Sequence, residues 1–433
     1  MSLDLKSIAR EVIEKLKAGG ADMAQCTLAL TEKREFNIDG GAFSLFRTTF
    51  GQSLNLTAYK GGRRGTLAQS SLAPEAIDKA IGECLALADA ASPDDAWEIA
   101  PSFGEKSFAA GKREPDVEGL FARTRELADD IKARYPKVMI EQMIVDHTGC
   151  DSVYADTSGN LYTKESGSYN VSLMFSGHEG DKASSFFASG FSSASLDAPF
   201  ISLGSVEMLL AAAEKQITTE AVDGKFVGTV IFTPECVGEL LSSIVDNFAS
   251  GNALIEGTSI WKDKLGEVVA DESVTVAIAP HTDEILHRQE YTGDGYPTEN
   301  FYLIEKGVLR SFVASVYAAN KAGIERSKNT SSAFVVAGGE KSLDELIASV
   351  DRGLLVSRIS GGRPASSGDF SAVAKNSFLI EDGKIGAAVS ETMISGNLAE
   401  MLMHPAGASA ERVADGYTLL PYLAFSGITV SGK

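Results

Sequence analysis

The sequence predicts an α+β protein with two domains, because helical and strand patterns are segregated along its 433 residues. Amphipathic stretches with proline or glycine boundaries indicate helices, mostly in the first part of the chain. Short strand-like runs separated by Gly, Asp and Asn indicate antiparallel sheets. Two similar hairpins, FLIEDGKIG and YLIEKGVLR, close at Asp-Gly and Lys-Gly.

Residues 1–200 are expected to form an N-terminal domain of helices packed on an antiparallel sheet. The first helix follows from an apolar stripe at Leu5, Ile8, Val12 and Leu16, which Gly19-Gly20 can end. Further helices are predicted over 74–90, which begins with proline, and over 117–135. The strands are expected over 25–30, 33–38, 50–59, 66–70, 138–146, 152–156, 160–168, 169–175 and 184–191, and 91–112 is expected to be irregular.

Residues 201–433 are expected to form a C-terminal domain rich in short antiparallel strands, with the boundary somewhere within 190–225. A helix over 205–220 and a short buried strand over 228–232 precede a second helix over 233–248. The other strands are predicted over 275–278, 301–304, 308–314, 353–359, 377–381, 384–389 and 427–430, with helices over 343–350 and 399–403.

Composition excludes several function classes. The formal charge of −20 and the pI near 4.8 describe a surface that repels nucleic-acid phosphates and anionic lipid heads. The four cysteines form no C-x-x-C pair, which is typical of a reducing compartment. The N-terminus does not read as a signal peptide, and no apolar run approaches the roughly 18 residues of a membrane span. We therefore expect a cytoplasmic protein without a direct nucleic-acid or membrane role.

The segment TPECVGELLSSIVDNF, residues 233–248, carries a candidate site. Pro234 suits a first helical turn, and Glu235 and Glu239 lie one turn apart, so that both can face the same way. This frame looks like a zinc-protease helix without the histidines that would hold the metal. A metal site with unusual ligands, a site that has lost its metal and a core-packing helix with a solvated acidic edge all stay open. The residues by themselves favour the last.

The segment HTDEILHRQE, residues 281–290, holds the densest group of potential metal ligands. The spacing of His281 and His287 matches no metal template, and a solvated surface loop is the favoured interpretation. TGDGYPTEN, residues 292–300, is either a turn before a strand or a loop that lines a cleft. SGGRPASSGDF, residues 360–370, is a flexible loop that could bind a ligand but lacks the features of a phosphate loop.

The order and spacing of several segments resemble the TldD/PmbA family, also called the modulator-of-DNA-gyrase family, over nearly the whole chain. These segments are GQSLNLTAYKGGRRGTLAQSSL (51–72), SIWKDKLGEVVA (259–270), GDGYPTENFYLIEKGVLRSFVASVYAANKAG (293–323), SSGDFS (366–371) and FLIEDGKIGAAVSETMISGNLAEML (378–402). The resemblance makes Asp294, Gly295, Asn300 and Asp369 candidates for binding substrate or lining a cleft. One departure is Asn55, where the family often carries Arg.

The family resemblance also interprets the helix. TldD-like members resemble zinc proteases with an H-E-x-x-x-H helix and a later Cys, and here Pro234, Glu235 and Glu239 fall on the three helix positions. The C-terminal YTLLPYLAFSGITVSGK contains no Cys. This pattern is similar to the PmbA/TldE-like branch, so no metal or cofactor is expected in this chain, and zinc is expected only in a TldD-like partner. The catalytic residues then belong to that partner.

The resemblance implies a subunit of a peptidase, as a heterodimer or larger assembly with a TldD-like chain or as a homodimer. The resemblance further implies that such a complex accepts unfolded peptides, matures peptide antibiotics and degrades antitoxins. The link to gyrase is then indirect, through peptides that poison gyrase. Two alternatives stay open. One is an autonomous metallohydrolase in which His281 or His287 joins Glu235 and Glu239. The other is a peptide-binding scaffold that takes an extended peptide at a sheet edge. The substrate, the partner and the role of the two histidines are not predicted.

Overall fold

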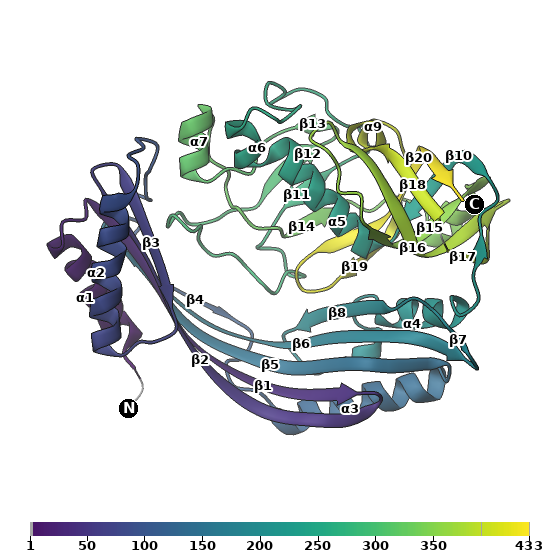
Figure 1. Cartoon of the computed structure of the whole chain (residues 1–433), viewed down its shortest axis with the longest axis horizontal. Helices are drawn as coiled ribbons and strands as arrows, with labels where there is room; N and C mark the ends of the chain where they lie inside the picture. The colour runs from purple at the N-terminus through teal and green to yellow at the C-terminus, as the bar shows by residue number, and fades with distance from the viewer. Residues whose placement is uncertain (1–2, 391, 433) are drawn as a thin grey trace.

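The computed structural model describes residues 3–390 and 392–432 and confirms the α+β class. Figure 1 shows two layers, each built around a sheet, with the N-terminal sheet below the C-terminal one. The first sheet has the order β3-β2-β1-β5-β6-β4, and β7 and β8 also pair with β6. Its strands are β1 (Met23–Asp39), β2 (Ala42–Lys60), β3 (Arg63–Gln69), β4 (Glu105–Ala110), β5 (Val138–Asp156), β6 (Leu161–Glu179), β7 (Lys182–Ala183) and β8 (Phe187–Ser193).

Four helices cover this sheet. At one end, α1 (Leu5–Ala18) packs on β1 and β5, and α2 (Pro74–Ala90) packs on β2 and β3. Towards the other end, α3 (Val117–Arg134) contacts β5 and β1, and α4 (Val206–Lys215) contacts β6 and β8. The side chains of Asp4 and Asp116 cap α1 and α3, each accepting a backbone N–H from the first turn.

The first sheet corrects several predicted strands. The runs expected over 25–30 and 33–38 form one strand, β1, and the runs over 138–146 and 152–156 form β5. In the same way, 160–168 and 169–175 lie in β6. The interval 91–112, expected to be irregular, contains β4. The polar residues 31 and 32 do not end β1, because β2 and β5 pair with it on both sides and satisfy its backbone hydrogen bonds.

The second sheet is larger and mixed. Its order is β13-β12-β11-β14-β20-β10-β15-β16-β17-β9, and β18 and β19 pair with strands of this path. Most pairs are antiparallel, but β10 runs parallel to β15, β14 to β20 and β17 to β9. The strands are β9 (Glu220–Ala221), β10 (Lys225–Phe232), β11 (Val276–Ile278), β12 (Phe301–Glu305), β13 (Val308–Leu309), β14 (Phe334–Val336), β15 (Arg352–Ser360), β16 (Asp369–Glu381), β17 (Lys384–Ser390), β18 (Thr392–Asn397), β19 (Pro405–Ala414) and β20 (Leu419–Ser431).

The helices of this half sit between or beside the strands. Helix α5 (Pro234–Ile244) packs on β20 and β15 and continues into a π-helical turn over Val245–Ala249. The others are α6 (Gly251–Ile255), α7 (Val316–Ala322), α8 (Leu343–Ala348) and α9 (Leu398–Met403). Fully buried Phe232, Val237 and Phe248 belong to the core that joins α5 to the sheet.

Two kinds of contact hold the layers together. One apolar core contains residues of both, including Leu209 of α4 and Tyr422 of β20. At the other end, Trp97 of the first half stacks on Tyr317 of α7 with ring centroids 3.8 Å apart. The arrangement of α4 on the first sheet means that the chain passes to the second layer after Lys215.

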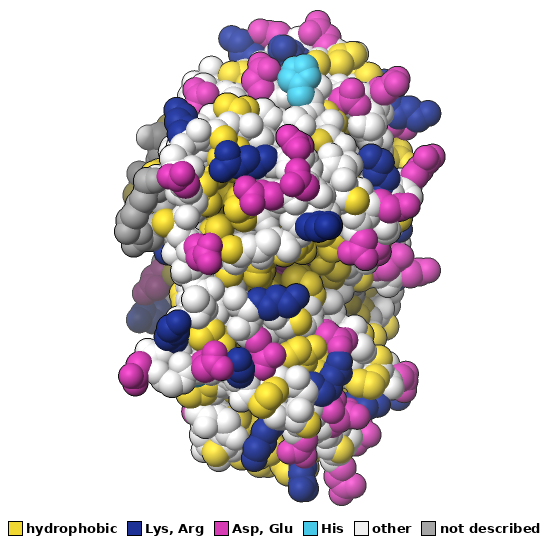
Figure 2. Space-filling view, turned by 90° about the vertical axis from the view of Figure 1, so that its right-hand side faces the viewer, with side chains coloured by type: hydrophobic (Ala, Val, Ile, Leu, Met, Phe, Trp, Pro, Cys, Tyr) yellow, Lys and Arg dark blue, Asp and Glu magenta, His cyan; other side chains and the backbone are white. Residues whose placement is uncertain are grey.

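The surface agrees with the composition. On the face seen in Figure 2, Lys and Arg side chains lie among Asp and Glu side chains, and no basic patch gathers there. Among the described residues, none of the helices combines the length and the apolar character that crossing a membrane requires.

Candidate functional site

A cleft of about 880 Å³ lies beside α5. Four segments far apart in the sequence form its walls. Its polar and charged lining comes from α5 and the turn after it (Glu235, Glu239, Ser242, Ser243, Asp246 and Asn247), from Ser332, from Arg363 in the loop after β15, and from the β19–β20 connection (Tyr417 and Thr418). A cleft of this size is sufficient for a peptide segment or a small ligand.

The sequence of α5 explains how the helix presents this wall. Pro234 occupies the first turn, where its missing N–H costs nothing. Val237, Leu241 and Ile244 are buried against the sheet. Because an α-helix repeats every 3.6 residues or about that, other side chains of α5, including Glu239, Ser242 and Ser243, line the cleft. The predicted amphipathic helix with an acidic edge is therefore present, and its acidic edge faces the cleft.

Glu235 lies between two cavities. It lines the cleft and also a second cavity of about 350 Å³, which is formed between α5, β8 and the helix α4 region. Its Oε2 atom is buried and has no hydrogen-bond partner, and the same holds for Oγ of Ser205, which also lines the second cavity. Unpaired buried oxygens are costly. The carboxylate is therefore available to accept a hydrogen bond from a group that enters either cavity.

Glu239 has a different environment. Partial burial raises the pKa of its carboxyl, and the positive charge of Arg358 opposes this shift. Burial also lowers the pKa of Arg358, whose Nη2 donates to Ser185 at 2.9 Å and whose guanidinium lies 4.2 Å from the centroid of the Phe186 ring. The positive charge of Arg358 in β15 thus partly offsets, by Coulombic attraction, the effect of burial on the carboxyl of Glu239 in α5.

The residues at the metal-ligand positions of the helix do not fit a zinc site. Pro234 has no donor atom, and Cys236 points into the apolar core, where burial raises the pKa of its thiol. No group of three or more His, Cys, Asp or Glu side chains in 3–390 and 392–432 is arranged to hold a metal ion. We therefore assign no metal-dependent step to Glu235 or Glu239.

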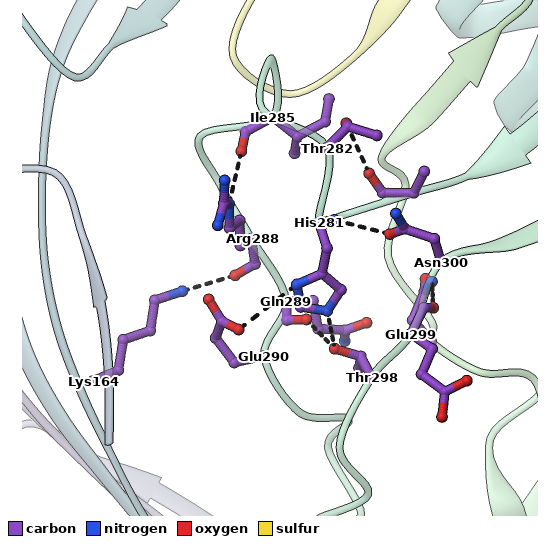
Figure 3. A network of polar contacts seen from close by, with 12 residues as sticks. Lys164, His281, Thr282, Ile285, Arg288, Gln289, Glu290, Thr298, Glu299 and Asn300 are labelled. Atoms are coloured by element: carbon purple, nitrogen blue, oxygen red, sulfur yellow. Dashed lines mark hydrogen bonds and ion pairs between the residues drawn. The ribbon is translucent and has the colours of Figure 1, made fainter. Parts of the chain in front are cut away.

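The two histidines of 281–290 have separate surroundings. Figure 3 shows His281 within a polar network: its Nε2 lies 2.8 Å from Oγ1 of Thr298, and its Nδ1 lies 3.8 Å from Oε2 of Glu290. His287 instead stacks on Tyr417 at 4.0 Å, and Tyr417 lines the cleft. The structure does not bring either histidine into a ligand group with Glu235 and Glu239.

The loop of residues 292–300 docks onto the first sheet. The backbone oxygen of Asp294 accepts from the N–H of Ala100, and its Oδ2 accepts from the N–H of Val316 at the start of α7. The carbonyl of Gly295 accepts from the hydroxyl of Tyr162 at 3.1 Å. Asn300 accepts the N–H of His281 at 2.9 Å. Asp294 and Gly295 therefore lie at the junction of the two layers, whereas Asn300 contacts His281 within the second half, and none of the three lines the cleft.

The fourth candidate, Asp369, begins β16 at the surface. Its carboxylate accepts from Oγ of Ser367 at 2.8 Å and from Nδ2 of Asn397 at 2.9 Å, and these bonds lower its pKa. The next residue, Phe370, lines the cleft. Asp369 therefore fixes the end of the 360–370 loop, whose residues 361–364 lie in the cleft wall.

Sequence reasoning did not single out Tyr417 and Thr418. They follow Asp415, whose Oδ1 accepts the backbone N–H groups of both, at 2.8 Å and 2.6 Å. The Asp-Gly signal at 415–416 marks a turn, but only the folded sheet brings this turn opposite α5.

Comparison with known proteins gives a family match. Residues 224–432 match the sequence model of the PmbA/TldA metallopeptidase C-terminal domain. The chain is 25% identical over 388 residues to the metalloprotease PmbA of Escherichia coli O157:H7, covering 86% of this chain and 81% of that protein. It is 30% identical over 194 residues to a metalloprotease of Methanothermobacter thermautotrophicus, and this match spans 42% of each chain.

Solved structures share the fold over the full length. TldE from Thermococcus kodakarensis aligns with a TM-score of 0.84 at 21% identity, covering 98% of this chain and 100% of that one. A protein from Bacteroides thetaiotaomicron, described as a putative modulator of DNA gyrase, aligns with a TM-score of 0.87 at 22% identity and covers 100% of both chains. The two-layer arrangement is therefore that of known structures.

Proposed function

The chain belongs to the PmbA/TldD family, and from this membership we propose that it is a PmbA/TldE-like subunit of a metallopeptidase complex. In this proposal a TldD-like partner holds the zinc and the catalytic residues. The substrates are unfolded peptides, which the complex cleaves or matures in the cytoplasm. The four free cysteines support a reducing compartment. The acidic surface supports a function without direct binding to nucleic acid.

Helix α5 is the observation that carries the proposal. It lies beside the cleft of about 880 Å³, and it carries Pro234, Glu235 and Glu239 at the positions that the family resemblance aligns with the zinc-protease motif. A catalytic zinc needs about three protein ligands and an open position. Because the donor set falls short of this, the cleft is suited to holding a peptide or a partner segment and unsuited to activating water on a metal.

Reconstitution tests the proposal. This chain, a TldD-like paralogue and their mixture are each assayed for cleavage of an unfolded peptide, and the zinc content of each is measured by mass spectrometry. We expect cleavage only in the mixture and zinc only in the paralogue. Glu235→Gln in this chain should leave the chemical step of the mixture intact. Proteolysis by this chain alone, lost on Glu235→Gln, would overturn the proposal in favour of an autonomous hydrolase.

A second candidate is a peptide-binding scaffold without a catalytic partner. It is favoured by β8, which pairs with β6 along one edge, while Ala188, Ser189 and Gly190 line the cavity next to Glu235. An extended peptide can pair with such an edge through its main chain. Capture from the native host distinguishes the two: a TldD-like chain among the bound proteins supports the subunit, and peptide binding with no such chain supports the scaffold.

A further inference from the structure

The second cavity, of about 350 Å³, lies between the two layers of the molecule. Its walls are β6, β8 and the residue before α4 on the side of the first sheet, and α5, β19 and the β19–β20 connection on the other side. Figure 1 shows β8 below β19 at this junction. Junctions between domains are common places for small-ligand sites. The polar residues of the lining are Ser172, Ser189, Ser205, Glu235, Asp415 and Thr418.

Two oxygen atoms of this lining lack a hydrogen-bond partner among residues 3–390 and 392–432. Ser205 is only 5% exposed, and its Oγ atom does not cap α4, although the residue stands at the N-cap position. Oε2 of Glu235 is buried and unpaired as well. Because such oxygens are costly to bury without a hydrogen bond, a ligand that donates to both would satisfy each of them.

The charges of the lining select the kind of ligand. Glu235 and Asp415 supply two carboxylates, and no Lys, Arg or His of the described chain lines the cavity. An anion is therefore disfavoured, and a cation is attracted. A divalent metal ion fits less well, because it requires several oxygen ligands and the described residues hold no group of three or more His, Cys, Asp or Glu side chains suited to one.

A primary ammonium group matches these acceptors. It carries one positive charge and three N–H donors that point in different directions, so it can donate to oxygens on separate elements. The unpaired oxygens of Ser205 and Glu235 come from the N-cap of α4 and from the first turn of α5. A guanidinium group is matched instead to both oxygens of a single carboxylate.

We propose that the second cavity binds a primary ammonium group of a peptide that occupies the neighbouring cleft, and that Ser205 and Glu235 accept its N–H groups. Glu235 and Thr418 line both the cleft and the second cavity, so the two spaces adjoin. The ammonium group is either the amino terminus of the peptide or the side chain of a lysine. The inference rests on the proposed function, because it takes the cleft as a peptide site, and it adds a preference among peptides.

Calorimetric titration of the full-length chain, without a paralogue, tests the proposal with three short peptides of equal length and amidated carboxyl terminus. The first is acetylated and has one central lysine. The second is acetylated and has norleucine there, which keeps the carbon chain of lysine without the ammonium group. The third has norleucine and a free amino terminus. We expect the first or the third to bind about tenfold or more tightly than the second, because hydrogen bonds to charged groups are the stronger ones. The peptide that gains affinity identifies the source of the ammonium group.

Two variants locate the ammonium group. Glu235→Gln keeps the shape of the side chain and removes its charge, and Ser205→Ala removes a hydroxyl that caps no helix. Each should lower the affinity for the preferred peptide by about tenfold and leave the affinity for the second peptide unchanged. Glu256→Gln is the control, since it removes the same charge from an exposed residue that lines neither the cleft nor the second cavity, and it should keep the preference. Circular dichroism checks that all three variants fold.

Equal affinities for the three peptides, or no binding by any of them at about millimolar concentration, would overturn the proposal. A preference that survives Glu235→Gln would also overturn it. A preference that is lost in Glu235→Gln but kept in Ser205→Ala would place the ammonium group on the cleft side of Glu235, against the assignment to the second cavity.

The outcome is separate from that of the peptidase-subunit proposal. The titration contains no paralogue and measures no cleavage, so equal affinities would leave the reconstitution result standing. A reconstituted mixture that cleaves nothing would likewise leave a measured ammonium preference intact. In an active mixture, Glu235→Gln should raise KM for the preferred peptide and leave kcat unchanged, because the lost interaction is one of binding.

Discussion

Replacing Gly295 by alanine should destabilise the junction between the two layers. Gly295 has φ +91, which costs a residue with a Cβ about 1–2 kcal/mol. The new Cβ would also overlap the hydroxyl of Tyr154, a side chain only 2% exposed that donates to Asp156 at 3.0 Å. Displacing that hydroxyl leaves a buried group unsatisfied, for about 1–3 kcal/mol more. We expect the free energy of unfolding to fall by about 2–5 kcal/mol.

Urea titration followed by circular dichroism measures this loss, and Gly293→Ala is its control. Gly293 lies in the same loop, a Cβ there would meet nothing within 4 Å, and its carbonyl can still accept from Gln25. We expect Gly293→Ala to stay within about 0.5 kcal/mol of the wild type. Equal stabilities for both variants would refute the argument that close approach requires glycine at 295.

Three further predictions concern the core, the pH dependence and the helix. Phe232→Ala removes a fully buried ring of β10 and should cost about 3–5 kcal/mol in urea unfolding; a loss under 1 kcal/mol would contradict the assigned core. Burial lowers the pKa of His147 below 6.5, so the unfolded chain binds more protons and stability should fall as the pH drops below about 6.5. His147→Gln should flatten the dependence of unfolding free energy between pH 7.5 and 5; an unchanged slope would count against this assignment. Pro234→His with Glu239→His supplies two imidazoles, and calorimetry should show zinc affinity at least about tenfold above either single variant; equal affinities would show that the helix positions do not converge.

The local sequence pattern predicted α5 well, because the residues that determine this helix lie in one continuous amphipathic segment. Pro234 marks its first turn, and buried Leu241 and Ile244 follow the helical period. Strand β1 shows the opposite case. Its polar residues Thr31 and Glu32 look like a break between two strands, yet they pair with residues 50–51 of β2 and 149–150 of β5, so the neighbouring strands determine β1.

The cleft could be predicted only in part. The 360–370 loop was recognisable from its glycines, and residues 361–364 do line the cleft. Tyr417 reaches the same cleft because β20 lies beside β10, which leads into α5, a pairing between segments about 190 residues apart. No local sequence pattern predicts which distant strands pair, and none predicts the hydrogen bond between Ala100 and Asp294.

The docked loop of residues 292–300 has a consequence for the order in which the chain is made. Gln25 meets the carbonyl of Gly293 across 268 positions, and Asp94 meets Lys321 across 227. At about 5–20 residues per second, roughly 10–50 s of synthesis separate the first pair. During that time the strands of the N-terminal sheet leave the ribosome. The side chains of Tyr154 and Tyr162 then still lack the contacts with residues that are synthesised later. The final closure of the molecule is therefore a late event, set by translation as much as by the speed of folding.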